Sequence, residues 1–339
     1  MIAQLNREYI KAFPKKILSR LYSYFLIEGR PATTKGRWFN PVTLAFLRTA
    51  SKSKAVAESE SPLFITGTGR SGSTILGMVL STHNDVLFLN EPKALWYLAN
   101  PSDDIIGSYS KSEGRYMMYG KDLVNGCAKE VKGVYSRSLK FTGTSKIVDK
   151  YPEMLFRTDY LCEMFSKPRF IFLSRNAAET IASTTNWTVK HRIEASKEDW
   201  WGVDGRKWKL LVEQVVPQDE DLSNHVEIVR GLTSESDKAA VEWIVSMNHG
   251  LKQILKYPDC VLRIRYEDLC ENSNRELQRI CDFAGLATDE KMLAYGRQTI
   301  KKQNIHHHPK VHPVLAEAIQ KVSRRLGYGS TPELINVIE

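Results

Sequence analysis

The sequence predicts an α/β fold in which helices flank a central parallel sheet. Short, continuous apolar runs recur along the chain, and stretches with helical periodicity separate them. Strands of a parallel sheet are covered on both faces, so they form continuous apolar runs rather than alternating ones. Alternation of such strands with helices is typical of this sheet, whose ligands bind at the carboxyl ends of the strands.

Five apolar runs predict the strands, at residues 64–65, 86–89, 146–148, 170–173 and 260–266. Helical spacing of apolar side chains predicts the helices between them. The first helix has one apolar face, formed by Ile75, Leu76, Val79 and Leu80. The others are expected at residues 152–165, 177 to about 183, 239–257 and 272–284, the last closed by Gly285, a favourable residue after a helix end.

The chain of 339 residues is long enough for one large α/β domain, which we expect at residues 59–330. Within it, residues 187–237 fit the strand–helix alternation poorly and combine many charges with Trp187, Trp200, Trp201 and Trp208. We predict that this segment is an insertion that forms a lid over the acceptor, meaning the molecule on which the protein would act. Its tryptophans would either stack on a sugar ring or pack in the interior.

Residues 1–58 are predicted to form a helical extension and a linker, the linker being the polar stretch 48–60. Apolar pairs recur at helical spacing within residues 17–26, among Lys15, Lys16, Arg20 and Arg30. A basic amphipathic helix can lie on a membrane surface, so peripheral membrane contact is one expectation. The other, which we favour, is that the helix packs against the main domain.

The net charge of +9 favours an anionic partner. Nucleic acid is not expected, because the sequence has no long arginine-rich run and no basic stripe interleaved with aromatic residues. The five cysteines are odd in number and lack C-x-x-C spacing, which argues against a disulfide framework or a zinc site. No apolar run approaches the length of a membrane span, and the N-terminus lacks a signal-peptide core, so we expect a cytoplasmic protein.

The stretch after the first strand predicts a phosphate-binding site. Gly67 and Gly72 have the spacing of a P-loop, but Ser73 stands where the P-loop lysine would follow, and the cation of the turn is Arg70. Glycines let backbone N–H groups close around a phosphate, and the following helix N-terminus adds partial positive charge. We call residues 67–74 the phosphate loop and expect its ligand to contact Gly69, Arg70, Ser71, Gly72, Ser73 and Thr74.

Other candidate residues follow the ends of the later strands. Glu91 follows the second, Lys150 the third and Arg175 the fourth, and Ser183 lies eight residues after Arg175. Each alone is more often structural, as a salt-bridging arginine or a helix-capping glutamate. Their joint placement at the edge where a parallel sheet binds ligands indicates a functional site.

These motifs together resemble those of sulfotransferases that use 3′-phosphoadenylyl sulfate (PAPS), a P-loop-related superfamily that includes carbohydrate and tyrosylprotein sulfotransferases. Gly69-Arg70-Ser71-Gly72-Ser73-Thr74 is similar to the 5′-phosphosulfate loop, and residues 170–176 with Ser183 are similar to the 3′-phosphate element. Residues 265–269 and 281–286 resemble a late structural element of the family. Asn90-Glu91-Pro92 and Asp149-Lys150-Tyr151-Pro152 resemble motifs of the tyrosylprotein-like branch.

The resemblance implies a P-loop-NTPase-like sulfotransferase fold, PAPS as donor, PAP as product and no metal. Arg70 and Lys150 would stabilise the sulfuryl and bridging oxygens, and Ser71–Thr74 would hold the 5′-phosphate. Arg175 and Ser183 would bind the 3′-phosphate. Glu91 would take the proton from the hydroxyl or amine of an acceptor, which we expect to be a glycan, a glycolipid or another metabolite.

Two other functions stay open. A P-loop kinase or NTPase would need a lysine after Gly72, which is absent, and a carboxylate for magnesium, which Asp149 could imitate. A non-catalytic nucleotide- or membrane-binding module would not need Glu91, Lys150 and Arg70 together. His306-His307-His308 could bind metal, but no partner spacing supports it, and a solvated loop is the favoured interpretation.

Overall fold

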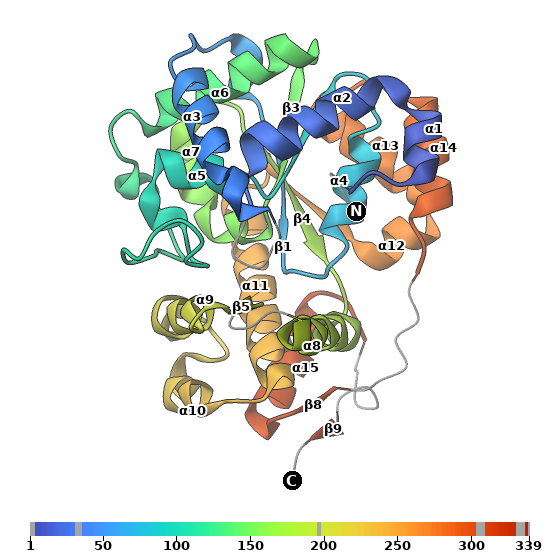
Figure 1. The fold of residues 1–339 in the computed structure, drawn as a ribbon. Helices are drawn as coiled ribbons and strands as arrows, with labels where there is room; N and C mark the ends of the chain where they lie inside the picture. The colour runs from blue at the N-terminus through green and yellow to red at the C-terminus, as the bar shows by residue number, and fades with distance from the viewer. Residues whose placement is uncertain (1–3, 31–35, 195–197, 303–308, 330–335, 338–339) are drawn as a thin grey trace.

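A five-stranded parallel sheet forms the centre of the molecule (Figure 1). The computed structural model describes residues 4–30, 36–194, 198–302, 309–329 and 336–337, so His306-His307-His308 lie outside the described residues. The strands β1 (Leu63–Gly67), β2 (Val86–Asn90), β3 (Lys146–Lys150), β4 (Arg169–Ser174) and β7 (Val261–Arg265) have the order β2-β3-β1-β4-β7. All neighbouring pairs are parallel, which confirms the predicted fold class.

The sheet separates two apolar cores, because successive strand side chains point to opposite faces. Phe64 packs into one core, whereas its neighbours Leu63 and Ile65 pack into the other. The first core is covered by α3 (Asn40–Ala50), α5 (Lys93–Ala99), α6 (Cys127–Thr142), α7 (Thr158–Met164), α11 (Glu235–Lys256) and α15 (Pro313–Arg325). The second is covered by α1 (Arg7–Ala12), α4 (Ser73–Leu80), α12 (Tyr266–Glu271), α13 (Ser273–Ala284) and α14 (Glu290–Thr299).

Two predicted helices differ from the observed ones. The periodic stretch 152–165 divides into a 3₁₀ segment, Pro152–Arg157, and α7. The break lies at Arg157. Its fully buried guanidinium pairs with Asp103 and donates to the carbonyl of Arg115, and these contacts hold the Arg157 side chain in the interior rather than on the surface of a regular helix. Helix α8 (Ala177–Glu194) continues past residue 183, because it packs lengthwise on α11.

The N-terminal extension packs directly on the sheet. The Lys16 ammonium on α2 (Pro14–Ser23) donates to the carbonyls of Asn84 and Val86, and the Arg20 guanidinium donates to the carbonyl of Phe88. Strand β2 is the edge of the sheet, so these side chains satisfy edge carbonyls that would otherwise be unpaired. Helix α3 ends at Ala50, within the stretch 48–60 that the sequence suggests as a linker.

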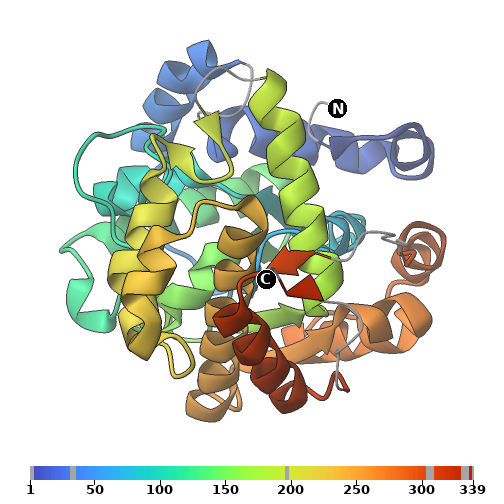
Figure 2. The ribbon, with the colours of Figure 1, turned by 90° about the horizontal axis from the view of Figure 1, so that it is seen from below.

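The segment predicted as an insertion lies below the sheet in Figure 1, beside α8. After α8 it forms a short hairpin, β5 (Glu198–Asp199) and β6 (Gly202–Val203), followed by α9 (Arg206–Leu210) and α10 (Val226–Gly231). Figure 2 shows α8 and this segment from below, crossing the face that closes over the strand ends. Within the described residues, no helix has the length and apolar character needed to cross a membrane.

Candidate active site

Strand register brings the predicted site residues together in two pairs. Asn90 at the end of β2 is in register with Lys150 at the end of β3, and the backbone N–H of Glu91 donates to the carbonyl of Lys150 over 2.7 Å. On the other side of β1, Gly67 is in register with Leu173 of β4. The phosphate loop and Arg175 therefore leave adjacent strands at the same edge of the sheet.

The phosphate loop is compact and depends on two close approaches. Gly72, the N-cap of α4, has φ +98°, and a Cβ there would lie 2.3 Å from the Tyr266 ring. A Cβ on Gly69 would lie 2.2 Å from the ring of Trp200. The buried Ser71 hydroxyl donates back to the carbonyl of Thr68 and so holds the turn closed. Only glycine fits at these two positions without displacement of an aromatic ring.

Two of the predicted site residues have left-handed backbone conformations. Arg70 has φ +64° and Glu91 has φ +52°, and within the described chain only Gln4 and Asp204 share this property among non-glycine residues. Such a conformation costs about 1–3 kcal/mol and persists where the surroundings impose it, commonly at functional sites. The backbone conformation is therefore a second indication, independent of the sequence motifs, that Arg70 and Glu91 are functional residues.

Glu91 lies between two ammonium groups. Its Oε1 accepts from Lys150 Nζ at 2.5 Å, and its Oε2 lies 3.1 Å from Lys93 Nζ. Burial raises the pKa of the Glu91 carboxyl, but the charges of Lys150 and then Lys93 outweigh burial and hold this pKa below its usual range. The Lys150 side chain is almost fully buried, whereas 34% of the Glu91 side chain is accessible to solvent. The unliganded protein thus holds an ionised carboxylate at an accessible position.

A second group of charges connects the phosphate loop to β4. Arg70 Nε donates to Ser183 Oγ over 3.2 Å, and Arg175 donates to the carbonyl of Arg70 over 3.2 Å. Arg175 also forms an ion pair with Glu179 at 2.6 Å, and its guanidinium stacks over Tyr266 at 4.3 Å. Burial, and then the charge of Arg175, lower the pKa of Arg70. The two guanidinium groups create a positive region that favours an anion.

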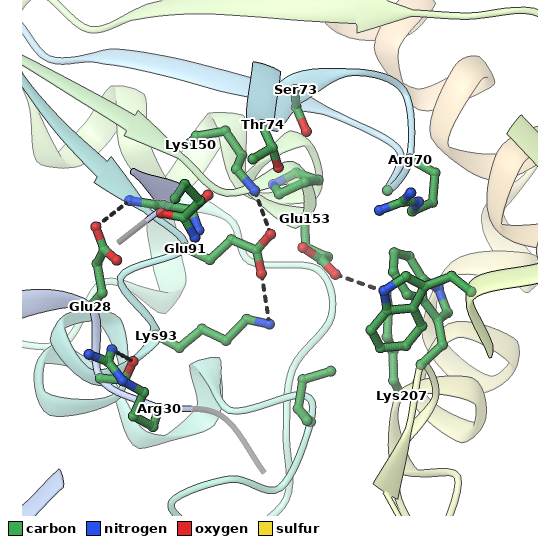
Figure 3. A pocket seen from close by; sticks show the side chains of 18 of the residues that line it. Glu28, Arg30, Arg70, Ser73, Thr74, Glu91, Lys93, Lys150, Glu153 and Lys207 are labelled. Atoms are coloured by element: carbon green, nitrogen blue, oxygen red, sulfur yellow. Dashed lines mark hydrogen bonds and ion pairs between the residues drawn. The ribbon is translucent and has the colours of Figure 1, made fainter. Parts of the chain in front are cut away.

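A cavity of about 370 Å³ opens between these groups. Figure 3 shows Ser73 and Thr74 with Lys150 beside them, Arg70 to one side, and Glu91 between Lys150 and Lys93. Gly69 also lines it. Arg175 and Ser183 contact Arg70 of the phosphate loop, but neither is among the described residues that line the cavity.

The cavity wall also contains residues that the motifs did not predict: Lys93, Glu153, Trp187, Trp200 and Lys207, with Tyr24, Glu28 and Arg30 from the N-terminal extension. The tryptophans belong to the cluster noted in the sequence, and Lys93 and Glu153 lie within three residues of Glu91 and Lys150. The other charged residues come from distant segments. Lys207 lies between Glu153 at 2.8 Å and Glu242 at 2.6 Å, and Trp200 Nε1 donates to Glu242 over 2.7 Å. This buried network fixes Trp200 against Gly69.

Asp149, the carboxylate that might imitate a magnesium ligand, faces the core instead. It is fully buried, and its Oδ2 accepts from Trp96 Nε1 over 3.0 Å and from the Tyr135 hydroxyl over 2.7 Å. Burial raises the pKa of Asp149 to about 7, although the two hydrogen bonds lower it. Asp149 is therefore not placed to hold a cation in the cavity. The described ranges contain no group of three His, Cys, Asp or Glu side chains that could hold a metal ion.

Comparison with known proteins supports a sulfotransferase. The model of the sulfotransferase family matches residues 62–217, which include the phosphate loop, Glu91, Lys150, Arg175 and Ser183. Among characterised proteins, the chain is similar to nodulation protein NoeE of Sinorhizobium fredii (strain NBRC 101917 / NGR234), with 25% identity over 246 residues. The aligned region covers 67% of this chain and 50% of NoeE, so the chain spans about half the length of that relative.

Similar solved structures include the sulfotransferase domain from the curacin biosynthetic pathway and sulfotransferase STF9 from Mycobacterium avium. The first has 15% identity and a TM-score of 0.47, and the match covers 80% of this chain and 98% of that one. The second has 12% identity and a TM-score of 0.46, with 91% and 88% covered. The family match to residues 62–217, on a parallel sheet whose strand ends carry the expected motifs, supports the sulfotransferase family as the family of this chain.

Proposed function

We propose that this protein transfers the sulfuryl group of PAPS to a hydroxyl or amine of an acceptor. The observation that carries the proposal is that Glu91 and its partner Lys150 line the same cavity as Arg70 and the start of α4. A positively charged glycine loop alone supports only phosphate binding. An accessible carboxylate paired with a buried lysine in the same cavity supplies the groups that a transfer reaction needs.

The donor would be held at both ends, by the phosphate loop in the cavity and by Arg175 and Ser183 next to that loop. The backbone N–H groups of residues 71–74, at the N-terminus of α4, would hold the 5′-phosphate, with the hydroxyls of Ser73 and Thr74 beside it. Arg175 and Ser183 would hold the 3′-phosphate. Arg175 would then exchange part of its pairing with Glu179 for the phosphate, because a guanidinium binds phosphate through two parallel hydrogen bonds.

Transfer requires little covalent work from the protein, so positioning and charge stabilisation dominate, as in phosphoryl transfer. The acceptor oxygen attacks sulfur, its proton passes to Glu91, and the bond between sulfur and the bridging phosphate oxygen breaks. Lys150 and Arg70 stabilise the charge that develops on the bridging and sulfuryl oxygens. Donor oxygens beside Lys150 compete with Glu91 for its ammonium, which makes the carboxylate a better base than it is in the free enzyme.

The acceptor we propose is a glycan, a lipid-linked saccharide or another small metabolite. The aromatic wall formed by Trp187 and Trp200 supports a saccharide, because sugar rings present apolar faces to aromatic side chains. A cytoplasmic location is part of the proposal, with peripheral membrane contact through the N-terminal extension. Lys16 and Arg20 are bound to β2, so such contact would depend on exposed apolar residues such as Leu18, which is 76% accessible.

The test is incubation of the purified chain with ³⁵S-labelled PAPS and an extract of small molecules and lipids from the host. We expect labelled product whose formation stops in the Lys150→Met variant. Donor binding without labelled product in any fraction would instead support a non-catalytic binding module. Product formed from γ-labelled ATP, but not from PAPS, would support the kinase alternative, which the buried position of Asp149 disfavours.

A further inference from the structure

Arg30 is a buried cation without a carboxylate partner among the described residues. Only 5% of the residue is exposed, and its guanidinium lies over the ring of Tyr24, 3.3 Å from the ring centroid. One terminal nitrogen, NH1, donates to the carbonyl of Gly29 over 2.7 Å. The other, NH2, is buried and has no hydrogen-bond partner in the described structure.

The backbone of Arg30 is held at this position from both sides. Its N–H donates to Asn40 Oδ1 over 2.8 Å, and Asn40 Nδ2 donates to the Arg30 carbonyl over 2.9 Å. Asn40 is the first residue of α3, so the side chain is presented by a fixed element of the fold. Burial of an unpaired charge is costly, and a structure that fixes one beside a cavity indicates an anionic ligand.

The pairing of the other charges in the cavity supports this interpretation. Glu28, the nearest carboxylate in sequence, is bound to Arg20 at 2.7 Å and to the N–H of Asn90, so its charge is already matched. Lys93 and Lys150 pair with Glu91, and Lys207 pairs with Glu153 and Glu242. Among the described cations that line the cavity, Arg70 and Arg30 alone lack a carboxylate partner.

These two unmatched cations lie at opposite ends of the cavity. Figure 3 shows Arg70 beside Ser73 and Thr74, and Arg30 on the far side of Glu91 and Lys93. Arg70 belongs to the donor end. Arg30 is therefore at the acceptor end, where a substituent of the molecule whose hydroxyl faces Glu91 would reach it.

We propose that Arg30 binds an oxyanion, a carboxylate or phosphoryl group, carried by the acceptor, so that the preferred acceptor is an acidic hydroxyl compound. This proposal rests on the proposed function for the direction of transfer, but the binding of an anion at Arg30 can be measured without transfer. A charged guanidinium hydrogen bond contributes about 1.5–3 kcal/mol, which corresponds to about 10- to 100-fold in affinity.

The experiment compares three probes that differ in one substituent: glucose, glucuronate and glucose 6-phosphate. The full chain, saturated with PAP to fill the donor site, is titrated with each probe, and the unfolding midpoint is recorded. We expect both acidic probes to bind at least about 10-fold more tightly than glucose. Their ranking distinguishes a carboxylate from a phosphoryl ligand.

Three variants assign the effect to Arg30. Arg30→Gln should remove the preference for acidic probes, and Arg30→Lys should retain part of it because the charge is kept. Arg48→Gln, which removes an exposed arginine of α3, should leave the preference as in the wild type. An acidic-probe preference that survives Arg30→Gln overturns the proposal, and so does a wild type that shows no preference.

A failure of the proposed function can be distinguished from a failure of the Arg30 proposal. A chain that PAP does not stabilise refutes the assigned donor. The same titrations, carried out without PAP in an Arg70→Gln background, then still decide whether Arg30 binds an oxyanion, because anion binding at the phosphate loop is weakened in that background.

Discussion

Replacement of Glu91 by glutamine tests the proposed base directly. Glutamine keeps the size and an acceptor oxygen for Lys150 Nζ, 2.5 Å away, but it cannot take a proton. Loss of a general base lowers the rate by about 10²–10⁴-fold. At about 1.36 kcal/mol for each tenfold, this loss is about 2.7–5.4 kcal/mol of transition-state stabilisation.

The assay is single-turnover transfer of ³⁵S from a preformed complex with PAPS, at saturating acceptor, so that neither binding nor product release limits the rate. The affinity for PAP, measured by calorimetry, should change by less than about threefold, because PAP lacks the sulfuryl group, which is the part of the donor that faces Glu91. Unchanged PAP affinity with slow transfer separates a catalytic defect from a folding defect.

The matched control is Glu153→Gln, which removes a second carboxylate from the same cavity. Lys207 keeps Glu242 as a partner in that variant, so we expect a loss of less than about tenfold, and Trp200 stays bound to Glu242. Glu91→Gln with turnover equal to that of Glu153→Gln would refute the assigned base.

The pH profile gives a second measure of Glu91. Lys150 and Lys93 hold its pKa below the usual range in the free enzyme, so the carboxylate is ionised well below neutrality. Since kcat/KM reports groups of the free enzyme, we expect no acid limb from Glu91 down to about pH 5. An acid limb with an apparent pKa near neutrality that disappears in Glu91→Gln would contradict the observed ion pairs.

Three further predictions concern the surrounding structure. Arg175→Ala should weaken binding of 3′,5′-ADP far more than binding of 5′-AMP, and equal losses in calorimetry would show that Arg175 does not bind the 3′-phosphate. Gly72→Ala should destabilise the fold by about 1–3 kcal/mol in urea unfolding and weaken PAP binding. Its control is Gly126→Ala, which has a similar φ of +90° but open space around the new Cβ, and equal losses would show that contact with Tyr266 is unimportant. Burial raises the pKa of Asp149 to about 7, above its ordinary value of about 3.9, so the folded state keeps a proton that the unfolded state loses. Its stabilising effect is therefore full below about pH 4 and is lost as the pH rises toward 7. The stability of the wild type relative to Asp149→Asn should thus fall between about pH 4 and pH 7, and a constant difference over this range would be evidence against this titration.

The sequence predicted the positions of the strands because each is a continuous apolar run bounded by polar residues. Strand ends then brought Glu91 to Lys150 and Arg70 to Arg175, since parallel strands place their carboxyl ends at one edge. The ion pair of Arg175 with Glu179 could not be predicted, because an i, i+4 pair on a helix has the same spacing whether it is exposed or buried beside a site.

The acceptor side of the cavity was beyond prediction for a related reason. Arg30 and Lys207 are single basic residues in basic, amphipathic surroundings, where a solvent-exposed position is the usual outcome. Only the folded chain shows that Arg30 is buried beside a cavity and that Lys207 holds two carboxylates. Likewise, Lys16 and Arg20 have the pattern of a membrane-facing helix but cap the edge of β2.

The most direct test of the central claim is thermal unfolding with 3′,5′-ADP and, separately, with ATP and magnesium. At 100-fold above its Kd, a ligand of the folded state adds about 2.7 kcal/mol of stability. Stabilisation by 3′,5′-ADP that falls in the Arg175→Ala variant is the result that a two-phosphate donor site built from the phosphate loop and Arg175 predicts. Stabilisation by ATP with magnesium, without any effect of 3′,5′-ADP, would contradict it.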